Sequence, residues 1–483
     1  MWKPKHTPEW SQLLLLAATA IRMVTSLGLT MMAGRMLTPG EFGGFALVAT
    51  AFGLAHEFTD MGSGNVAVRQ AARERGSERT VLENLLGLRL VLCIVAALAC
   101  AAFALARTDG FLRGMLLGTA TVLAFSFVSA FSTVFQLRQA QMRPAILSVA
   151  AQLSTVAIAA AMLLLSVDGG LLGGVIVLRE LAVIVGTTLL AVNLLGYTPR
   201  PRISREALGP FFGVALVVAL GTIAYHFQLQ GGLFWVQVMR PEPETGAFAA
   251  AQRPLNAILF LPWLVMLPMV PLLSWLAGHD RVAFLRQGRA AMDLLIGLGA
   301  VMGVVTFELA EPLLAFLYGG RFSSGPLSAV GTLHWYAVPL GASYAVAALS
   351  TILLADHREW ALLGVSAGGL ALYTVLNVML LPSVGFVGSA MATAGSLGFA
   401  TAGGMLILAR MGVLPNLRTL QILLPAAALA LVLPLLSGSP FVQLLIATPL
   451  TFAALAFVWR FPSLASSRAE QVALTREALG RTS

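Results

Sequence analysis

Long apolar segments alternate with short polar connections along almost the whole chain. Of the 483 residues, 58% are hydrophobic and only 11% are charged. A helix that crosses a bilayer needs about 20 apolar residues, so the pattern predicts an all-α polytopic membrane protein with about fourteen transmembrane helices. The predicted spans are 11–34, 40–62, 85–106, 114–136, 144–166, 171–196, 209–233, 246–275, 291–317, 327–355, 359–381, 384–409, 418–436 and 440–459. The connections are too short to hold a folded catalytic domain in water.

The basic residues follow the same alternation. They give the chain a net charge of +9, but they gather in every second connection, as the positive-inside rule requires of cytoplasmic loops. The opposite side holds only Arg35, Arg107, Arg113, Arg240 and Arg321. This asymmetry predicts that both termini are cytoplasmic, including a polar tail over 461–483. It also explains the basic composition without a nucleic-acid partner.

Sequence motifs of enzymes and metal sites are missing. Cys93 and Cys100 lie seven residues apart in one predicted helix and offer neither a disulfide framework nor a metal-ligand spacing. We expect them to pack as small apolar side chains. There is no DxD motif, no HExxH motif and no nucleotide-binding fingerprint. We therefore expect no cofactor, no metal and no enzymatic activity.

Two short motifs recur at a spacing that indicates a duplicated half. Glu41–Ala46 and Glu244–Ala249 match at four of six positions with an offset of 203 residues, and each lies at the start of a predicted span. Ala140–Arg143 and Ala355–Arg358 likewise follow spans that are six apart. Parallel repeats of this kind are common in transporters and place the substrate between the halves. We predict an N-terminal six-helix bundle at 1–205, a second bundle at 206–412 and two further helices at 413–460.

One hairpin of the chain resembles a known family. The stretch Gly34–Leu47, which reads GRMLTPGEFGGFAL, together with Asp60-Met61-Gly62 and Val68-Arg69, resembles the first helical hairpin of bacterial polysaccharide repeat-unit flippases. Gly246–Arg253, followed by Leu261-Pro262 and Leu267-Pro268, resembles the matching segment of the second half. Gly44 departs from the family, which usually has Leu or Met there. The family shares a superfamily with multidrug antiporters and peptidoglycan-precursor flippases.

This resemblance implies a MATE-like fold, with two six-helix bundles in a V and two C-terminal helices. It implies a bacterial inner-membrane flippase that moves undecaprenyl-diphosphate-linked oligosaccharide repeat units to the outer leaflet. Transport would proceed by alternating access, driven by the membrane potential or by a gradient of H⁺ or Na⁺. Surface polysaccharide assembly (O-antigen, capsule or exopolysaccharide) would follow, which suggests a polysaccharide polymerase and a chain-length regulator as partners beside membrane lipid. A lipid II flippase and a multidrug or cation antiporter of the same superfamily remain alternatives, although an antiporter would favour acidic groups in its cleft.

Polar residues inside the predicted spans form the candidate site. A charged side chain at the bilayer centre costs about 2.5–3.5 kcal/mol, so it usually faces a cavity or a partner. Helical spacing gives four of the spans a polar stripe, and these stripes should line a cleft between the halves. The stripes consist of Thr19, Arg22, Ser26 and Thr30, of His56, Glu57 and Asp60, of Thr222, Tyr225 and His226, and of Gln252, Arg253 and Asn256. We expect Arg22 and Arg253 to bind the diphosphate, because a guanidinium is planar, binds two oxygens and stays protonated.

Some charged positions within the spans have other interpretations. Arg89 lies near the cytoplasmic end of its span, and we expect its side chain to extend to the lipid headgroups. Arg179 and the adjacent Glu180 could form an internal ion pair. Asp60 could cap a helix beside Gly62 or, with His56 and Glu57, bind the coupling ion.

Overall fold

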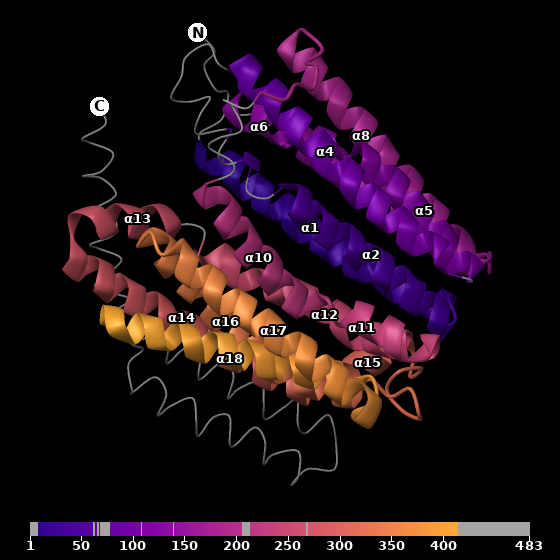
Figure 1. The fold of residues 1–483 in the computed structure, drawn as a ribbon. Coiled ribbons are helices and arrows are strands. Elements are labelled where there is room, and N and C mark those ends of the chain that lie inside the picture. Colours follow the sequence, from indigo (N-terminus) through magenta and orange to yellow (C-terminus); the bar gives the residue numbers. More distant parts are fainter. Residues whose placement is uncertain are drawn as a thin grey trace. The chain divides into compact units, whose positions relative to one another are not determined.

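The protein is helical throughout the part of the chain that the computed structural model describes, which is 8–60, 63–64, 67, 78–107, 109–138, 140–204, 213–266 and 269–413. Figure 1 shows long helices that run beside one another within each part of the molecule. The first half contains α1 (Pro8–Met36), α2 (Pro39–Asp60), α4 (Glu78–Leu105), α5 (Gly110–Phe125), η1 (Ser126–Ala130), α6 (Phe131–Leu137), α7 (Met142–Leu164), η2 (Gly169–Leu171) and α8 (Leu172–Leu195). The second contains α10 (Val214–Gln230), α11 (Gly232–Met239), α12 (Glu242–Met266), α13 (Met269–His279), α14 (Arg281–Glu308), α15 (Ala310–Tyr318), α16 (Val330–Ala355), α17 (Glu359–Val384) and α18 (Val387–Met411).

Every predicted span up to residue 409 coincides with a helix or with consecutive helices. The predicted spans 418–436 and 440–459 and the tail 461–483 lie outside the described residues. Eight helical segments in the described part are long and apolar enough to cross a membrane. They are Glu78–Leu105, Gly110–Leu137, Met142–Leu164, Gly169–Leu195, Arg281–Glu308, Val330–Ala355, Glu359–Val384 and Val387–Met411. The chain is therefore a multi-pass membrane protein, as predicted.

Several spans that hydropathy presents as continuous are broken in the structure. The span predicted at 114–136 contains the 3-10 segment η1 between α5 and α6. The span predicted at 209–233 is interrupted at Gly231, which separates α10 from α11. The predicted span 246–275 contains α12 and α13, and residues 267–268 between them lie outside the described residues. Hydropathy does not detect these breaks, because the backbone changes direction or pitch while the side chains stay apolar.

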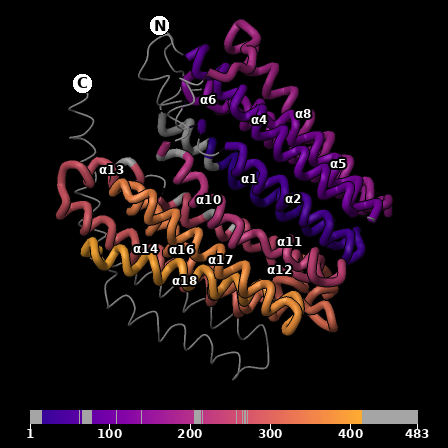
Figure 2. The backbone as a smooth tube through the Cα atoms, in the orientation of Figure 1, coloured from indigo at the N-terminus to yellow at the C-terminus, as the bar shows by residue number. Residues whose placement is uncertain are grey.

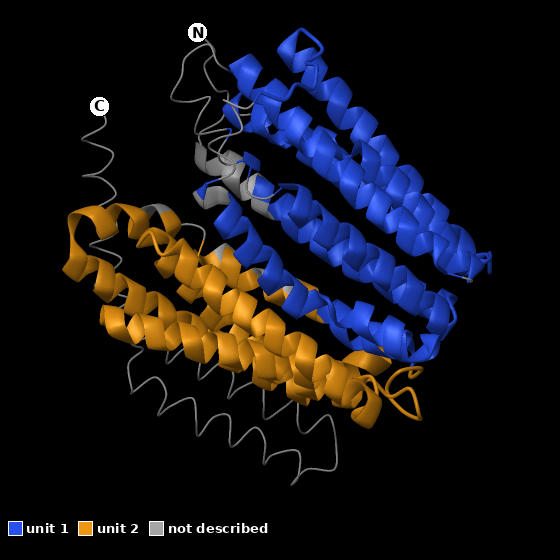
Figure 3. Ribbon diagram, viewed as in Figure 1, with its two compact units in different colours: residues 1–254, 317–319 blue, residues 255–316, 320–483 orange. Residues whose placement is uncertain are grey.

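The described helices belong to two compact units, which Figure 3 distinguishes by colour. The first consists of residues 1–254 and 317–319, and the second of residues 255–316 and 320–483. The division into bundles at 1–205 and 206–412 remains a prediction.

In the first unit, α2 packs among several other helices. It contacts α1, α4, α5, α10 and α11. A separate apolar core joins α4, α6 and α8 through Leu85, Phe135 and Ala191, each of which is at most 1% exposed. On the outer surface, large apolar side chains such as Leu98 and Leu178 are 64% and 68% exposed. Such faces are suited to lipid rather than to water.

In the second unit, α14, α16, α17 and α18 pack side by side (Figure 2). The crossing of α14 and α16 depends on glycine, since a Cβ added at Gly299 would lie 2.9 Å from the carbonyl oxygen of Gly341. Small residues at such crossings let helix backbones approach closely in a membrane. The Tyr344 hydroxyl donates a hydrogen bond of 2.9 Å to the carbonyl oxygen of Ile258 and ties α12 to α16 within this unit.

Candidate functional site

The site is built around the start of α2, where the sequence repeat begins. Thr38 and Glu41 form a reciprocal cap: the Thr38 N–H and hydroxyl donate to Glu41 Oε2 at 2.9 and 2.7 Å. This pairing satisfies backbone groups that a helix start otherwise leaves open. Glu244, the equivalent of Glu41 in the repeat, accepts two hydrogen bonds of 2.8 Å from Arg240 at the start of α12. That bidentate contact raises the pKa of Arg240. The repeated glutamate thus orders a helix start in both copies.

The two copies of the repeat also pack directly against each other. A Cβ added at Gly43 would lie 2.6 Å from the backbone nitrogen of Gly246 and 2.9 Å from the carbonyl carbon of Thr245. A Cβ added at Gly246 would collide with the carbonyl oxygen of Pro39. The matched glycines are therefore the point where α2 and α12 cross with their backbones in contact. The two matching motifs thus supply the glycines at this crossing.

Arg253 reaches from α12 to α2 about two helical turns beyond the crossing at Gly246. Its guanidinium donates to the carbonyl oxygen of Ala46 and, at 2.9 Å, to the hydroxyl of Thr50, whereas its Nε is buried without a hydrogen-bond partner. Tyr318, at the end of α15, lies within electrostatic range of Arg253, and its ring is tilted against that of Phe42 with the ring centroids 5.5 Å apart. Thr50 and Tyr318 were not among the site residues predicted from the sequence. Both are uncharged, so neither stands out on an apolar helix, and Tyr318 is remote in sequence from the other residues of the site.

Arg22 lies in the middle of α1 and has a different environment. It is exposed, and its guanidinium makes no hydrogen bond or ion pair with the described residues. The hydroxyls of Thr19 and Thr30 donate at 2.9 Å to the carbonyl oxygens of Leu15 and Ser26 in their own helix. The threonine hydroxyls of the predicted polar stripe are thus bonded within α1, and Arg22 is the charged residue of that stripe. Within the described residues, no hydrogen bond joins Arg22 to Arg253.

The stripe on α10 lies beside α2. Glu57, of α2, is within electrostatic range of His226, and the rings of Tyr225 and His226 meet edge to face at 5.6 Å. Thr222 donates at 2.9 Å to the carbonyl oxygen of Val218, and Gln252 donates at 3.0 Å to that of Leu229. His56 is exposed, and Oδ1 of Asn256 is buried without a hydrogen-bond partner. The structure thus connects α2, α10 and α12, although the assignment of these residues to a cleft remains a prediction.

The expectation that Arg89 extends to the lipid headgroups is wrong. Arg89 is 1% exposed and forms an ion pair with Asp60. It also donates hydrogen bonds to the hydroxyls of Ser63 at 3.3 Å and Ser129 at 2.8 Å. The guanidinium stays inside because Asp60 neutralises it there, and a buried charge needs such a partner. By contrast, the predicted internal ion pair of Arg179 and Glu180 is confirmed, and Gln152 accepts a further hydrogen bond of 2.5 Å from Arg179.

Comparisons with known proteins agree with this architecture. Residues 11–276 match the family model described as polysaccharide biosynthesis protein. The structure is similar to the lipid II flippase MurJ in an inward closed conformation, with a TM-score of 0.69, 14% sequence identity, and coverage of 93% of this chain and 99% of that one. It also resembles an inward-facing multidrug resistance MATE family transporter, with a TM-score of 0.59, 14% identity, and coverage of 82% and 98%. A third similar structure is a transporter of the MOP superfamily from Pyrococcus furiosus, described as having a binding pocket of reverse polarity, with a TM-score of 0.55, 13% identity, and coverage of 82% and 94%.

A search among curated proteins found no match. The family match covers more than half of the chain, and the fold similarity covers nearly all of it. The predicted MATE-like fold is confirmed. The chain belongs to the polysaccharide biosynthesis protein family and has the fold shared by MurJ and the MATE transporters of the MOP superfamily.

Proposed function

We propose that this protein is a flippase that moves undecaprenyl-diphosphate-linked oligosaccharides across the bacterial inner membrane for surface polysaccharide assembly. Family membership supports the link to polysaccharide biosynthesis. The similarity to a lipid II flippase supports a fold that is able to carry a lipid-linked headgroup. Both termini would lie in the cytoplasm, where the positive-inside rule places them.

The observation that carries this proposal is the difference between the intramembrane arginines. Arg89 and Arg179 have carboxylate partners, Asp60 and Glu180. Among the described residues, Arg253 donates only to the neutral groups of Ala46 and Thr50, and Arg22 has no hydrogen-bond or ion-pair partner. A guanidinium kept in the membrane without a carboxylate is suited to an anionic ligand. The two arginines without a carboxylate are the pair that the sequence predicts for the diphosphate.

The mechanism follows from these contacts. The diphosphate oxygens would bind Arg22 and replace the neutral acceptors of Arg253, which frees Arg253 from α2. The sugar would occupy an aqueous cleft while the prenyl chain stays in lipid. Movement of the two halves would then expose the headgroup outside. The membrane potential, negative inside, favours outward movement of negative charge by about 2.3 kcal/mol per charge per 100 mV. H⁺ or Na⁺ bound near His56, Glu57 or Asp60 would reset the empty carrier.

The proposal is tested by complementation of a strain that lacks the gene. Arg22→Ala and Arg253→Ala, expressed at wild-type level, should abolish surface polysaccharide and leave lipid-linked repeat units on the inner leaflet. Arg→Lys at either position should restore part of the activity, since the charge remains but the bidentate geometry is lost. Normal polysaccharide from the Arg22→Ala/Arg253→Ala double variant would exclude the diphosphate assignment.

A matched control separates the role of these two arginines from loss of membrane charge in general. The variant Arg179→Gln/Glu180→Gln neutralises an intramembrane ion pair without leaving a carboxylate unpaired. We expect it to make normal amounts of polysaccharide. The same strains test the alternative substrates: rescue of cells depleted of their lipid II flippase would assign the peptidoglycan precursor instead, and drug resistance without polysaccharide would assign an antiporter.

A further inference from the structure

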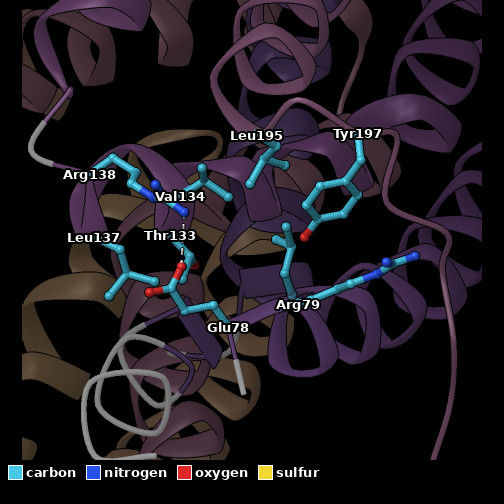
Figure 4. A pocket seen from close by; sticks show the side chains of 9 residues that line it. Glu78, Arg79, Thr133, Val134, Leu137, Arg138, Leu195 and Tyr197 are labelled. Carbon is cyan, nitrogen blue, oxygen red and sulfur yellow. Dashed lines mark hydrogen bonds and ion pairs between the residues drawn. The ribbon is translucent and has the colours of Figure 1, made fainter. Parts of the chain in front are cut away.

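A cavity of about 380 Å³ lies within the first unit, away from α1, α10 and α12. Its walls come from α4, from α6 and from the end of α8 with the segment that follows it. Figure 4 shows Glu78, Arg138 and Leu137 on one side of the cavity and Tyr197 on the other, with the side chain of Arg79 extending past Tyr197. The cavity thus combines a charged, partly exposed rim with an apolar wall.

The ends of three membrane-spanning segments meet at this cavity. Glu78 begins one candidate span, and Leu137 and Leu195 end two others. A cavity at the ends of spanning helices lies at the level of the lipid headgroups. The charge distribution along the chain places this end on the cytoplasmic side. An amphiphile that enters from the membrane can therefore place its polar head on the rim and its chains along Leu137 and Leu195.

The rim carries more positive than negative charge. Arg138 pairs with Glu78 at 3.2 Å, while Glu83 accepts from Arg79 at 3.0 Å and lies 3.4 Å from Arg202. The pair between Arg138 and Glu78 is half exposed on both sides, at 50% and 52%. Exposed ion pairs contribute at most about 1 kcal/mol, so a stronger anion can displace the carboxylate.

Two neutral polar side chains, Tyr197 and Thr133, also line the cavity. The guanidinium of Arg79 lies 4.8 Å over the ring of Tyr197, which fixes its position on the rim. Burial raises the pKa of the Tyr197 hydroxyl further from neutral pH, so this hydroxyl is a hydrogen-bond donor there, as an ordinary tyrosine is. Thr133 also lines the cavity, and its hydroxyl is buried without a hydrogen-bond partner. The cavity therefore offers guanidinium and hydroxyl donors to the oxygens of a ligand.

We propose that this cavity binds the phosphate headgroup of an anionic phospholipid of the cytoplasmic leaflet. Arg138 binds the phosphate, Arg79 on the other side of the cavity adds positive charge to the site, and the acyl chains follow the apolar wall. Basic pockets between membrane helices on the cytoplasmic side are suited to anionic headgroups. The site is separate from Arg22 and Arg253, so the proposal does not depend on the transported substrate.

The test is a titration of the purified full-length protein with phosphatidylglycerol, followed by native mass spectrometry. The wild type should bind one phosphatidylglycerol saturably and should prefer it to phosphatidylcholine. The variant Arg79→Gln/Arg138→Gln should bind it about twenty-five-fold more weakly, since each guanidinium near an anionic lipid surface contributes about fivefold. Glu78→Gln removes the competing carboxylate and should strengthen binding, a gain that a misfolded protein would not show.

The control is Arg107→Gln, which removes an arginine of similar environment from the other end of α4. Its guanidinium lies 4.4 Å over the ring of Phe103. Equal binding by wild type and Arg79→Gln/Arg138→Gln, or an equal loss in Arg107→Gln, would overturn the assignment. Saturation of the site by inorganic phosphate with no gain from the lipid would also overturn it, since the ligand would then be a soluble anion.

Discussion

The buried arginines of the membrane helices differ in how their charge is compensated. Arg89 is nearly inaccessible and is held by Asp60 and two serine hydroxyls, so its charge is compensated inside the protein. Arg253 is compensated only by neutral oxygens, and one of its nitrogens has no acceptor. Removing a charge from its partner is costly in a low-dielectric interior, whereas an incompletely satisfied guanidinium can still accept an anion. The same residue type is thus structural at one position and a candidate ligand at another.

Replacement of Arg89 tests the structural role. Arg89→Met leaves Asp60 without its counter-charge and should destabilise the protein by about 3 kcal/mol, the lower part of the range for a broken buried pair, because Asp60 is 38% exposed. Thermal unfolding in detergent measures the loss. Arg89→Met/Asp60→Asn should recover part of it, since no carboxylate remains unpaired.

Arg138→Gln is the control for that measurement. Its pair with Glu78 is half exposed, so its loss should change stability by less than about 1 kcal/mol. A similar loss in Arg89→Met and Arg138→Gln would show that the Arg89 pair is not a buried structural contact.

At the level of helices, the crossing of α2 and α12 leaves no space for a side chain at its glycines. Gly43 faces backbone atoms of Thr245 and Gly246, and backbone cannot move aside as a side chain can. Extra atoms in a packed contact cost about 1–3 kcal/mol. Since the proposed transport cycle frees Arg253 from α2, this crossing is also the contact that movement of the two helices would change.

Gly43→Ala should therefore lower the thermal stability of the purified protein by about 1–3 kcal/mol and reduce polysaccharide export. Gly53→Ala is the matched control, because it lies on the same helix with no atom within 4 Å of an added Cβ. There the alanine should be neutral or stabilising by up to about 1 kcal/mol, through its higher helix propensity. Equal stability of the two variants would contradict the tight crossing.

At the scale of the whole molecule, the orientation in the membrane follows from charge alone and remains a prediction. We expect single cysteines at Asp109 and Ser324 to react with a membrane-impermeant thiol reagent in intact cells, whereas one at Ser77 should react only after the cells are opened. The background for this experiment is Cys93→Ala/Cys100→Ala, which removes the native thiols. Asp109 caps α5, so its replacement should cost about 1 kcal/mol, which a folded protein tolerates. The reverse labelling pattern would invert the topology.

The sequence by itself determined the positions of the helices, the membrane class and the family. Each depends on local information: about 20 apolar residues in a row suffice to mark a span, and one hairpin motif suffices to suggest the family. The repeat at Glu41 and Glu244 also indicated a duplication, and the structure shows that its glycines lie at the contact between α2 and α12. The predicted site residues on these helices were found because a polar stripe stands out on an apolar helix.

Only the tertiary structure decided which partner each of these residues has. Arg89 pairs with Asp60, which is 29 residues away in sequence, and Arg253 reaches Thr50, which is 203 residues away. The placement of Arg89 at a helix end suggested lipid headgroups, because hydropathy does not reveal a counter-charge on a neighbouring helix. The breaks at η1 and at Gly231 escaped detection for a related reason, since hydropathy does not report where the backbone leaves the regular α-helix. Charge compensation and helix breaks depend on neighbours in space, and those neighbours are set by the fold.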